Sequence, residues 1–194
     1  MKKKVAIFGT AADPIHLGHV ETVRAASRVV DEVWVMPCWK HKYNKNMADP
    51  HHRLLMTWLS MRELNCVVTH NFEIKNLLSC GTYELLNMLS ERYLDHEFSF
   101  VVGQDNADTI EKWVNAQKLI QEYSFIVVPR KGYKPISEWY NESPHVYLNE
   151  ADIPDISSTE IRKSLAVDPQ SVANLLHPDV FNYIKKSGLY KVAL

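Results

Sequence analysis

Two histidines lie three residues apart where an apolar run gives way to a helical pattern. The stretch GTAADPIHLGHV (9–20) holds His16 and His19, with Gly18 between them. Residues at i and i+3 share a helix face, and the unpaired N–H groups at a helix N-terminus attract anions. Gly18 has no side chain, so a flat ligand could come close to the backbone there. The pattern predicts a phosphate site with two imidazoles; the alternative is a helix start with two surface histidines.

A second candidate phosphate site lies near the end of the chain. The stretch ISSTEIRKSL (156–165) places Ser157, Ser158 and Thr159 ahead of a helical run that carries Arg162. Hydroxyl side chains often cap helices, so one interpretation is an ordinary N-cap with Arg162 in solvent. The other is a second phosphate cradle, in which the hydroxyls, the helix N-terminus and Arg162 act together.

Short apolar runs alternate with helical patterns along the whole chain. We expect strands at 4–8, 31–37, 67–74 (with an irregular extension), 98–103, 124–129 and 145–149. We expect helices at 17–29, 50–64, 82–93 and 108–123 (one helix or two short ones), and helical pieces after residue 158. This alternation predicts an α/β fold with a doubly wound parallel sheet.

The loops that follow the strands should gather at one edge of that sheet, where such folds bind ligands. These loops are 9–19, 37–42, 103–105 and 129–132. Gly9 is expected to turn the chain tightly out of the first strand.

Composition limits the classes of protein. A chain of 194 residues with 46% hydrophobic residues predicts one domain over 1–194, with a helical C-terminal part from about 157. The net charge of −1 argues against nucleic acid, and no apolar stretch is long enough for a membrane span. Three widely spaced cysteines indicate reduced thiols and a cytoplasmic protein. No spacing of residues predicts a metal site.

The motif G-x-x-x-D-P-I-H-x-G-H followed by S-S-T-x-I-R resembles the nucleotidylyltransferase superfamily. Further segments resemble the bacterial nicotinate-mononucleotide adenylyltransferases: MPCWKHK (36–42), HRLLM (52–56), VVGQDNADTIEKW (101–113), VVPRKGY (127–133) and HPDVFNYIKKSGLY (177–190). The chain departs from the family pattern at Ala12, at Trp39-Lys40 and around Thr82-Tyr83. The resemblance implies a Rossmann-like nucleotidylyltransferase fold.

The resemblance also implies a reaction. The phosphate of a pyridine mononucleotide attacks the α-phosphate of ATP and pyrophosphate leaves, with Mg²⁺ bridging the phosphates. The implied catalytic residues are His16, His19, Lys42 and Arg162. The implied ATP-binding residues are Gly9, Thr10, Ala11, His16, Gly18, His19, Gly103, Asp105, Ser157, Ser158, Thr159 and Arg162. The implied residues that bind the mononucleotide are His41, Lys42, Thr82, Tyr83, Trp113 and Arg130.

Other interpretations stay open from the sequence. Trp113 and Tyr83 could be packing aromatics, and Arg130 could be a solvated charge. The acceptor could be another phosphate compound such as phosphopantetheine, or the chain could be an ATP-binding regulator without turnover. Nicotinate and nicotinamide mononucleotide are not distinguished, although the resemblance favours the nicotinate form. A homo-oligomer is compatible with the sequence but is not specified by it.

Overall fold

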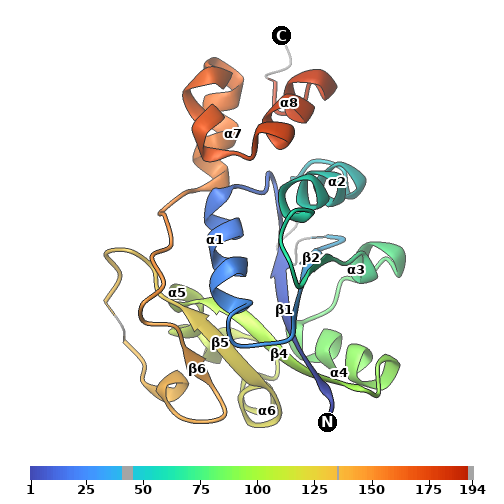
Figure 1. Ribbon diagram of the computed structural model, residues 1–194, viewed down its shortest axis with the longest axis vertical. Helices are drawn as coiled ribbons and strands as arrows, with labels where there is room; N and C mark the ends of the chain where they lie inside the picture. The colour runs from blue at the N-terminus through green and yellow to red at the C-terminus, as the bar shows by residue number, and fades with distance from the viewer. Residues whose placement is uncertain (41–45, 135, 192–194) are drawn as a thin grey trace.

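The computed structural model describes residues 1–40, 46–134 and 136–191, and it contains a six-stranded sheet with helices on both faces (Figure 1). The strands are β1 (Lys3–Thr10), β2 (Glu32–Pro37), β3 (Val67–Thr69), β4 (His96–Gly103), β5 (Ser124–Val128) and β6 (Val146–Tyr147). Their order is β3-β2-β1-β4-β5-β6, and every adjacent pair is parallel. The prediction of a doubly wound α/β fold is confirmed.

Alternate residues of each strand enter different cores, as the period of a strand requires. Ala6 and Phe8 of β1 pack in one core, and Val5 and Ile7 in the other. The first core takes residues from α1 (Leu17–Ala26), α2 (Pro50–Met61), α7 (Ser158–Val167), the 3-10 helix Pro169–Leu175 and α8 (Pro178–Ser187). The second takes residues from α4 (Thr82–Arg92), α5 (Gln104–Ala107), α6 (Ala116–Glu122) and the 3-10 helices Ile110–Lys112 and Trp139–Asn141. Both faces of the sheet are therefore buried, which is why its strands are apolar throughout.

Two local predictions differ from the structure. Gly9 lies inside β1 and makes no turn; the chain turns instead at Ala12, which adopts the left-handed conformation with φ 50°. The stretch 67–74 is a strand only as far as Thr69, because Phe72–Lys75 forms a short helix, α3. The expectation for 108–123, one helix or two short ones, is met by the second form: a 3-10 helix at Ile110–Lys112 and α6.

The strand order of the sheet reverses between β1 and β4. The chain adds β2 and β3 on one side of β1 and then β4, β5 and β6 on the other, so the carboxyl ends of β1 and β4 flank a crevice where ligands bind in folds of this type. Helices α7 and α8 lie beyond the same end of the sheet, above the start of α1 (Figure 1). None of the helices in the described part of the chain has the length and apolarity needed to cross a bilayer.

Candidate active site

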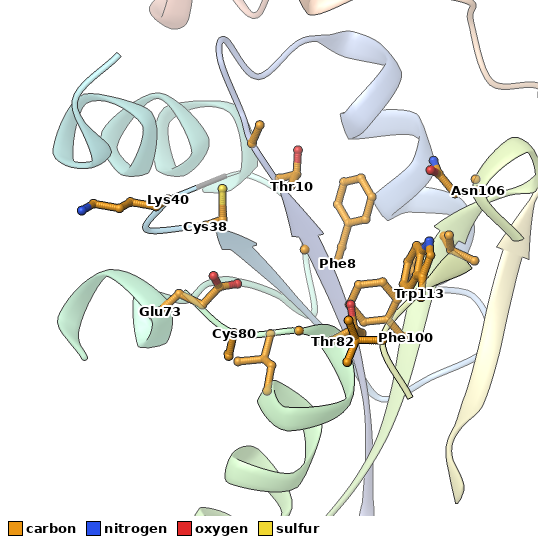
Figure 2. Close-up of a pocket in the computed structure, with 18 of the residues that line it drawn as sticks. Phe8, Thr10, Cys38, Lys40, Glu73, Cys80, Thr82, Phe100, Asn106 and Trp113 are labelled. Atoms are coloured by element: carbon orange, nitrogen blue, oxygen red, sulfur yellow. The ribbon is translucent and has the colours of Figure 1, made fainter. Parts of the chain in front are cut away.

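Two adjoining cavities open at the carboxyl ends of β1 and β4. The histidine cavity, about 360 Å³, is lined by His16, Gly18, His19, Thr22, Asp105, Val128, Pro129, Arg130 and residues 153–156. The tryptophan cavity, about 390 Å³, is lined by Cys38, Lys40, Glu73, Cys80, Gly81, Thr82, Leu85, Phe100, Val101, Val102, Lys112, Trp113 and Val114 (Figure 2). Both cavities also take Phe8 to Ala11, Gly103 and Asn106 as a common wall. The loops after β1, β2, β4 and β5 do gather at one edge, as predicted.

The two histidines stand at the start of α1 with their rings 3.7 Å apart. The backbone N–H of His16 donates to Nδ1 of His19 over 3.2 Å. A neutral imidazole has one N–H, so this bond places the proton of His19 on Nε2 and makes that atom a donor. The His16 side chain is 7% exposed, and its Nδ1 is buried without a protein partner. Such an atom is normally satisfied by a water or a ligand.

Burial keeps both rings neutral near pH 7. It lowers the pKa of His16 to about 4. Burial, and then the neighbouring His16, lowers the pKa of His19 as well. The pair therefore offers hydrogen-bond donors to an anion, and a bound anion would in turn favour its protonation.

Two glycines of this region pack closely against their neighbours. A Cβ on Gly18 would lie 3.1 Å from the His16 ring and 3.2 Å from the Pro154 carbonyl oxygen. A Cβ on Gly103 would lie 2.8 Å from Oδ1 of Asp105. Gly18 thus leaves room for the His16 ring itself, a reason that the sequence alone did not reveal.

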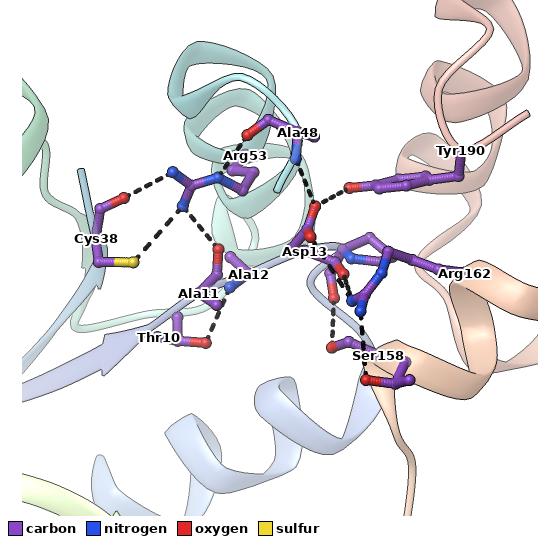
Figure 3. Close-up of polar contacts among 12 residues, drawn as sticks. Thr10, Ala11, Ala12, Asp13, Cys38, Ala48, Arg53, Ser158, Arg162 and Tyr190 are labelled. Atoms are coloured by element: carbon purple, nitrogen blue, oxygen red, sulfur yellow. Dashed lines mark hydrogen bonds and ion pairs between the residues drawn. The ribbon is translucent and has the colours of Figure 1, made fainter. Parts of the chain in front are cut away.

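The second motif is packed against the first. Ser157 is the N-cap residue of α7 but makes no side-chain capping bond. Ser158 Oγ donates to the Pro14 carbonyl over 3.0 Å, and Arg162 donates to the Asp13 carbonyl over 2.6 Å and to Thr159 Oγ1 over 3.3 Å (Figure 3). The structure therefore brings the two motifs together and does not leave Arg162 in open solvent. The adjacent residues 153–156, rather than Arg162, line the histidine cavity.

The other predicted residues divide between the cavities. Asp105 forms an ion pair with Arg130 over 2.6 Å in the histidine cavity, and Arg130 also reaches Asp155. Trp113 lines the tryptophan cavity beside Thr82 and packs edge-on against Phe100.

Tyr83 is placed away from both cavities. Its hydroxyl donates to Glu122, and its ring packs near Tyr123, which is the packing alternative noted above. His41 and Lys42 lie outside the described residues.

Two buried charged residues of the site were missed. Arg53 is fully buried behind the loops after β1 and β2, and Glu73 is 8% exposed in the wall of the tryptophan cavity. Burial raises the pKa of Glu73 to about 7, against the opposing effects of the Trp39 N–H and Arg53. The burial of Arg53 could have been predicted from the sequence, because it lies at helical spacing from Met56 and Ser60 on the buried face of α2.

The fold and these cavities define a nucleotide-binding protein of the nucleotidyltransferase class. The model of the Cytidylyltransferase-like family matches residues 7–164, and the chain belongs to this family.

Its relatives are adenylyltransferases. A probable nicotinate-nucleotide adenylyltransferase of Caldicellulosiruptor saccharolyticus is 34% identical, over 97% of this chain and 99% of that protein. The nicotinate-nucleotide adenylyltransferase of Bacillus subtilis is 30% identical over the same shares. The structure of Plasmodium falciparum nicotinic acid mononucleotide adenylyltransferase complexed with NaAD superposes with a TM-score of 0.83, 26% identity and 97% coverage of both chains. These findings confirm the resemblance and the enzyme class, and they do not favour the phosphopantetheine or regulator alternatives.

Replacing His16 with glutamine is expected to reduce the loss of stability at acid pH. The unfolded chain protonates this ring near pH 6.5 and the folded protein only near pH 4, so the free energy of unfolding falls as the pH is lowered between these values. The full effect is about 3 kcal/mol, and His16→Gln removes it. Urea denaturation at about pH 7.5 and about pH 4.5 measures the difference.

The exposed His51, at the start of α2, provides the control. The His51→Gln variant should lose stability with acid as the unsubstituted protein does. An equal acid loss in His16→Gln would contradict the assignment of this titration to His16.

Proposed function

We propose that this protein joins ATP and nicotinate mononucleotide to form the dinucleotide and pyrophosphate, a step of NAD biosynthesis. The observation that carries the proposal is that the histidine cavity and the tryptophan cavity share the wall from Phe8 to Ala11. A triphosphate in the first cavity and a mononucleotide in the second would meet at that wall. The full-length similarity to nicotinate-nucleotide adenylyltransferases supports the same assignment of substrates.

In the proposed reaction, an oxygen of the mononucleotide phosphate attacks the α-phosphorus of ATP. A new P–O–P linkage forms, the bond to the β-phosphate breaks, and its electron pair leaves with pyrophosphate. Such transfers depend on positioning and on stabilisation of charge, which suits a site without a nucleophile. His16 and His19 donate to the phosphates beside the N-terminus of α1, and ATP also contacts residues 9–11 and Gly18.

The remaining roles are assigned by cavity. Gly103 and Asp105 hold the adenosine ribose, with Arg130 fixing the Asp105 carboxylate. Trp113 and Thr82 bind the pyridine ring, and Lys40 adds positive charge on the acceptor side. Residues 157–159 and Arg162 line neither cavity; the resemblance assigns them to the departing pyrophosphate, and Ser158 and Arg162 are bonded to the loop after β1.

ATP reacts as its complex with a divalent cation, and we propose Mg²⁺. The described residues contain no cluster of three or more potential metal-ligand side chains. Mg²⁺ commonly keeps several waters and is bound through substrate phosphates, so the proposal needs few protein ligands.

The proposal is tested by release of pyrophosphate from MgATP with a panel of acceptors. We expect turnover with nicotinate mononucleotide, slower turnover with nicotinamide mononucleotide, and a product with the mass of the dinucleotide. Turnover with phosphopantetheine alone would contradict the proposed acceptor. Binding of ATP without pyrophosphate release with any acceptor would indicate a regulator.

Replacing Arg162 with alanine is expected to lower kcat/KM for ATP by about 30- to 1000-fold, or about 2–4 kcal/mol of transition-state stabilisation. Lysine should restore only part of this, since it is a point charge and not a planar fork. The KM for the mononucleotide should change less, because the acceptor lies on the far side of the α-phosphate. Steady-state kinetics with each substrate varied in turn make the measurement.

The matched control is Lys163→Ala, which removes the neighbouring exposed cation. It should leave the kinetics for ATP unchanged. Normal ATP kinetics in Arg162→Ala would contradict this role and leave Arg162 only its structural contacts with Asp13 and Thr159.

Replacing Glu73 with glutamine is expected to remove a pH dependence of acceptor binding. The pKa of Glu73 is about 7, so its carboxyl ionises in the cavity wall as the pH rises past neutrality and repels an anionic mononucleotide. The KM for nicotinate mononucleotide should therefore rise about 3- to 10-fold from pH 6.5 to pH 8.5 in the unsubstituted protein, and should stay level in Glu73→Gln.

The exposed Glu63, beyond the end of α2, provides the control. Glu63→Gln should retain the rise in KM. A rise that persists in Glu73→Gln would have to be assigned to another group.

A further inference from the structure

Arg53 is a fully buried cation that donates to backbone carbonyls from three parts of the chain and, over 3.9 Å, to Cys38 Sγ (Figure 3). Nε donates to Ala48 over 2.9 Å, and Nη1 donates to Ala11 over 2.8 Å. Nη2 donates to Cys38 over 2.8 Å and to Trp39 over 3.1 Å. One guanidinium therefore connects the loop after β1, the loop after β2 and the start of α2.

These partners belong to the walls of the two cavities. Ala11 lies in the wall that the cavities share, and Cys38 and Lys40 line the tryptophan cavity. Arg53 lines neither cavity among the residues described. It lies behind the loops and fixes the distance between them.

The chemistry of the side chain suits this task. Burying a cation costs free energy unless all its N–H groups are hydrogen-bonded. The planar guanidinium has five N–H groups and can bond several carbonyls at fixed angles. The first turns of α2 hold the backbone of Arg53, because its N–H donates to the Asp49 carbonyl and Thr57 Oγ1 donates to the Arg53 carbonyl. The nearby Glu73 offsets part of the charge, since Arg53 acts to lower the pKa of that carboxyl.

We propose that Arg53 is a positioning residue for the acceptor: it holds the loop of Cys38 and Trp39 against the loop of Ala11, and thereby sets where the acceptor phosphate stands relative to the α-phosphate of ATP. This inference rests on the proposed function, which places the mononucleotide in the tryptophan cavity. The loop after β1 has other anchors, because Asp13 is bonded to Ala48, Tyr190 and Arg162. ATP binding is therefore less dependent on Arg53 than acceptor alignment is.

The test compares Arg53→Lys and Arg53→Met with Met61→Ala. Met61 is a buried apolar residue at the other end of α2, so its truncation lowers thermal stability without touching the loops. Three quantities are measured on each variant at a temperature where all are folded: the Kd of ATP by calorimetry without acceptor, kcat and KM for the mononucleotide, and the Tm.

We expect kcat/KM for the acceptor to fall about 10- to 100-fold in Arg53→Lys and further in Arg53→Met, with the Kd of ATP little changed. Met61→Ala should lose a similar amount of Tm but keep normal kinetics. The proposal is overturned if Arg53→Lys behaves kinetically as Met61→Ala does, or if ATP binding and acceptor turnover fall together. If Arg53→Met does not fold, Arg53→Lys decides the matter.

The acceptor panel separates this test from that of the proposed function. Turnover with another acceptor and with neither pyridine mononucleotide would refute the proposed function. The same comparison of variants, made with that acceptor, would still decide the role of Arg53.

Discussion

The buried carboxylate of Asp13 holds the loop on which both phosphate motifs depend. Its Oδ1 accepts hydrogen bonds from the Ala48 N–H and the Tyr190 hydroxyl, and its own carbonyl accepts from Arg162 (Figure 3). Burial, followed by the charge of Asp13, raises the pKa of Tyr190, so that hydroxyl remains a donor. Because a buried carboxylate is costly without its hydrogen bonds, these partners must come together for the loop to be buried at all. The start of α2, the C-terminal segment and α7 are thus all joined to the start of α1.

The strand order of the parallel sheet sets the surroundings of the loop after β1. Since β1 lies between β2 and β4, the end of β1 borders the crevice at which the sheet changes direction. The same residues of β1 then form the wall of two cavities, one beside a helix N-terminus and one lined with aromatic rings. Two anionic reactants can approach each other there without sharing a cavity. At Gly18 and Gly103 the backbone itself borders this site, because the His16 ring, the Pro154 carbonyl and the Asp105 carboxylate pack against it.

The class of fold and the place of the two histidines at a helix start could be predicted from the sequence because both are local patterns. Apolar strands and a strand-to-helix turn with two histidines are visible in a short window. Arg53, Glu73 and the contacts of Asp13 could not be predicted in the same way, because their roles come from segments far apart: Tyr190 is 177 residues from Asp13. The turn expected at Gly9 failed for a related reason, since pairing with β2 extends β1 through Thr10 and moves the turn to Ala12.

The charged groups of the site are arranged in two layers. Arg53 donates to the Ala11 carbonyl and lines neither cavity, so it lies behind the loop after β1. His16 and His19, held neutral by burial, line the cavity itself. A donor with a full positive charge throughout the reaction would bind reactants, transition state and pyrophosphate more alike, and uniform binding does not raise kcat. In the proposed reaction, the N–H groups of His16 and His19 interact more strongly as negative charge builds up on the phosphates, so their stabilisation is greatest in the transition state.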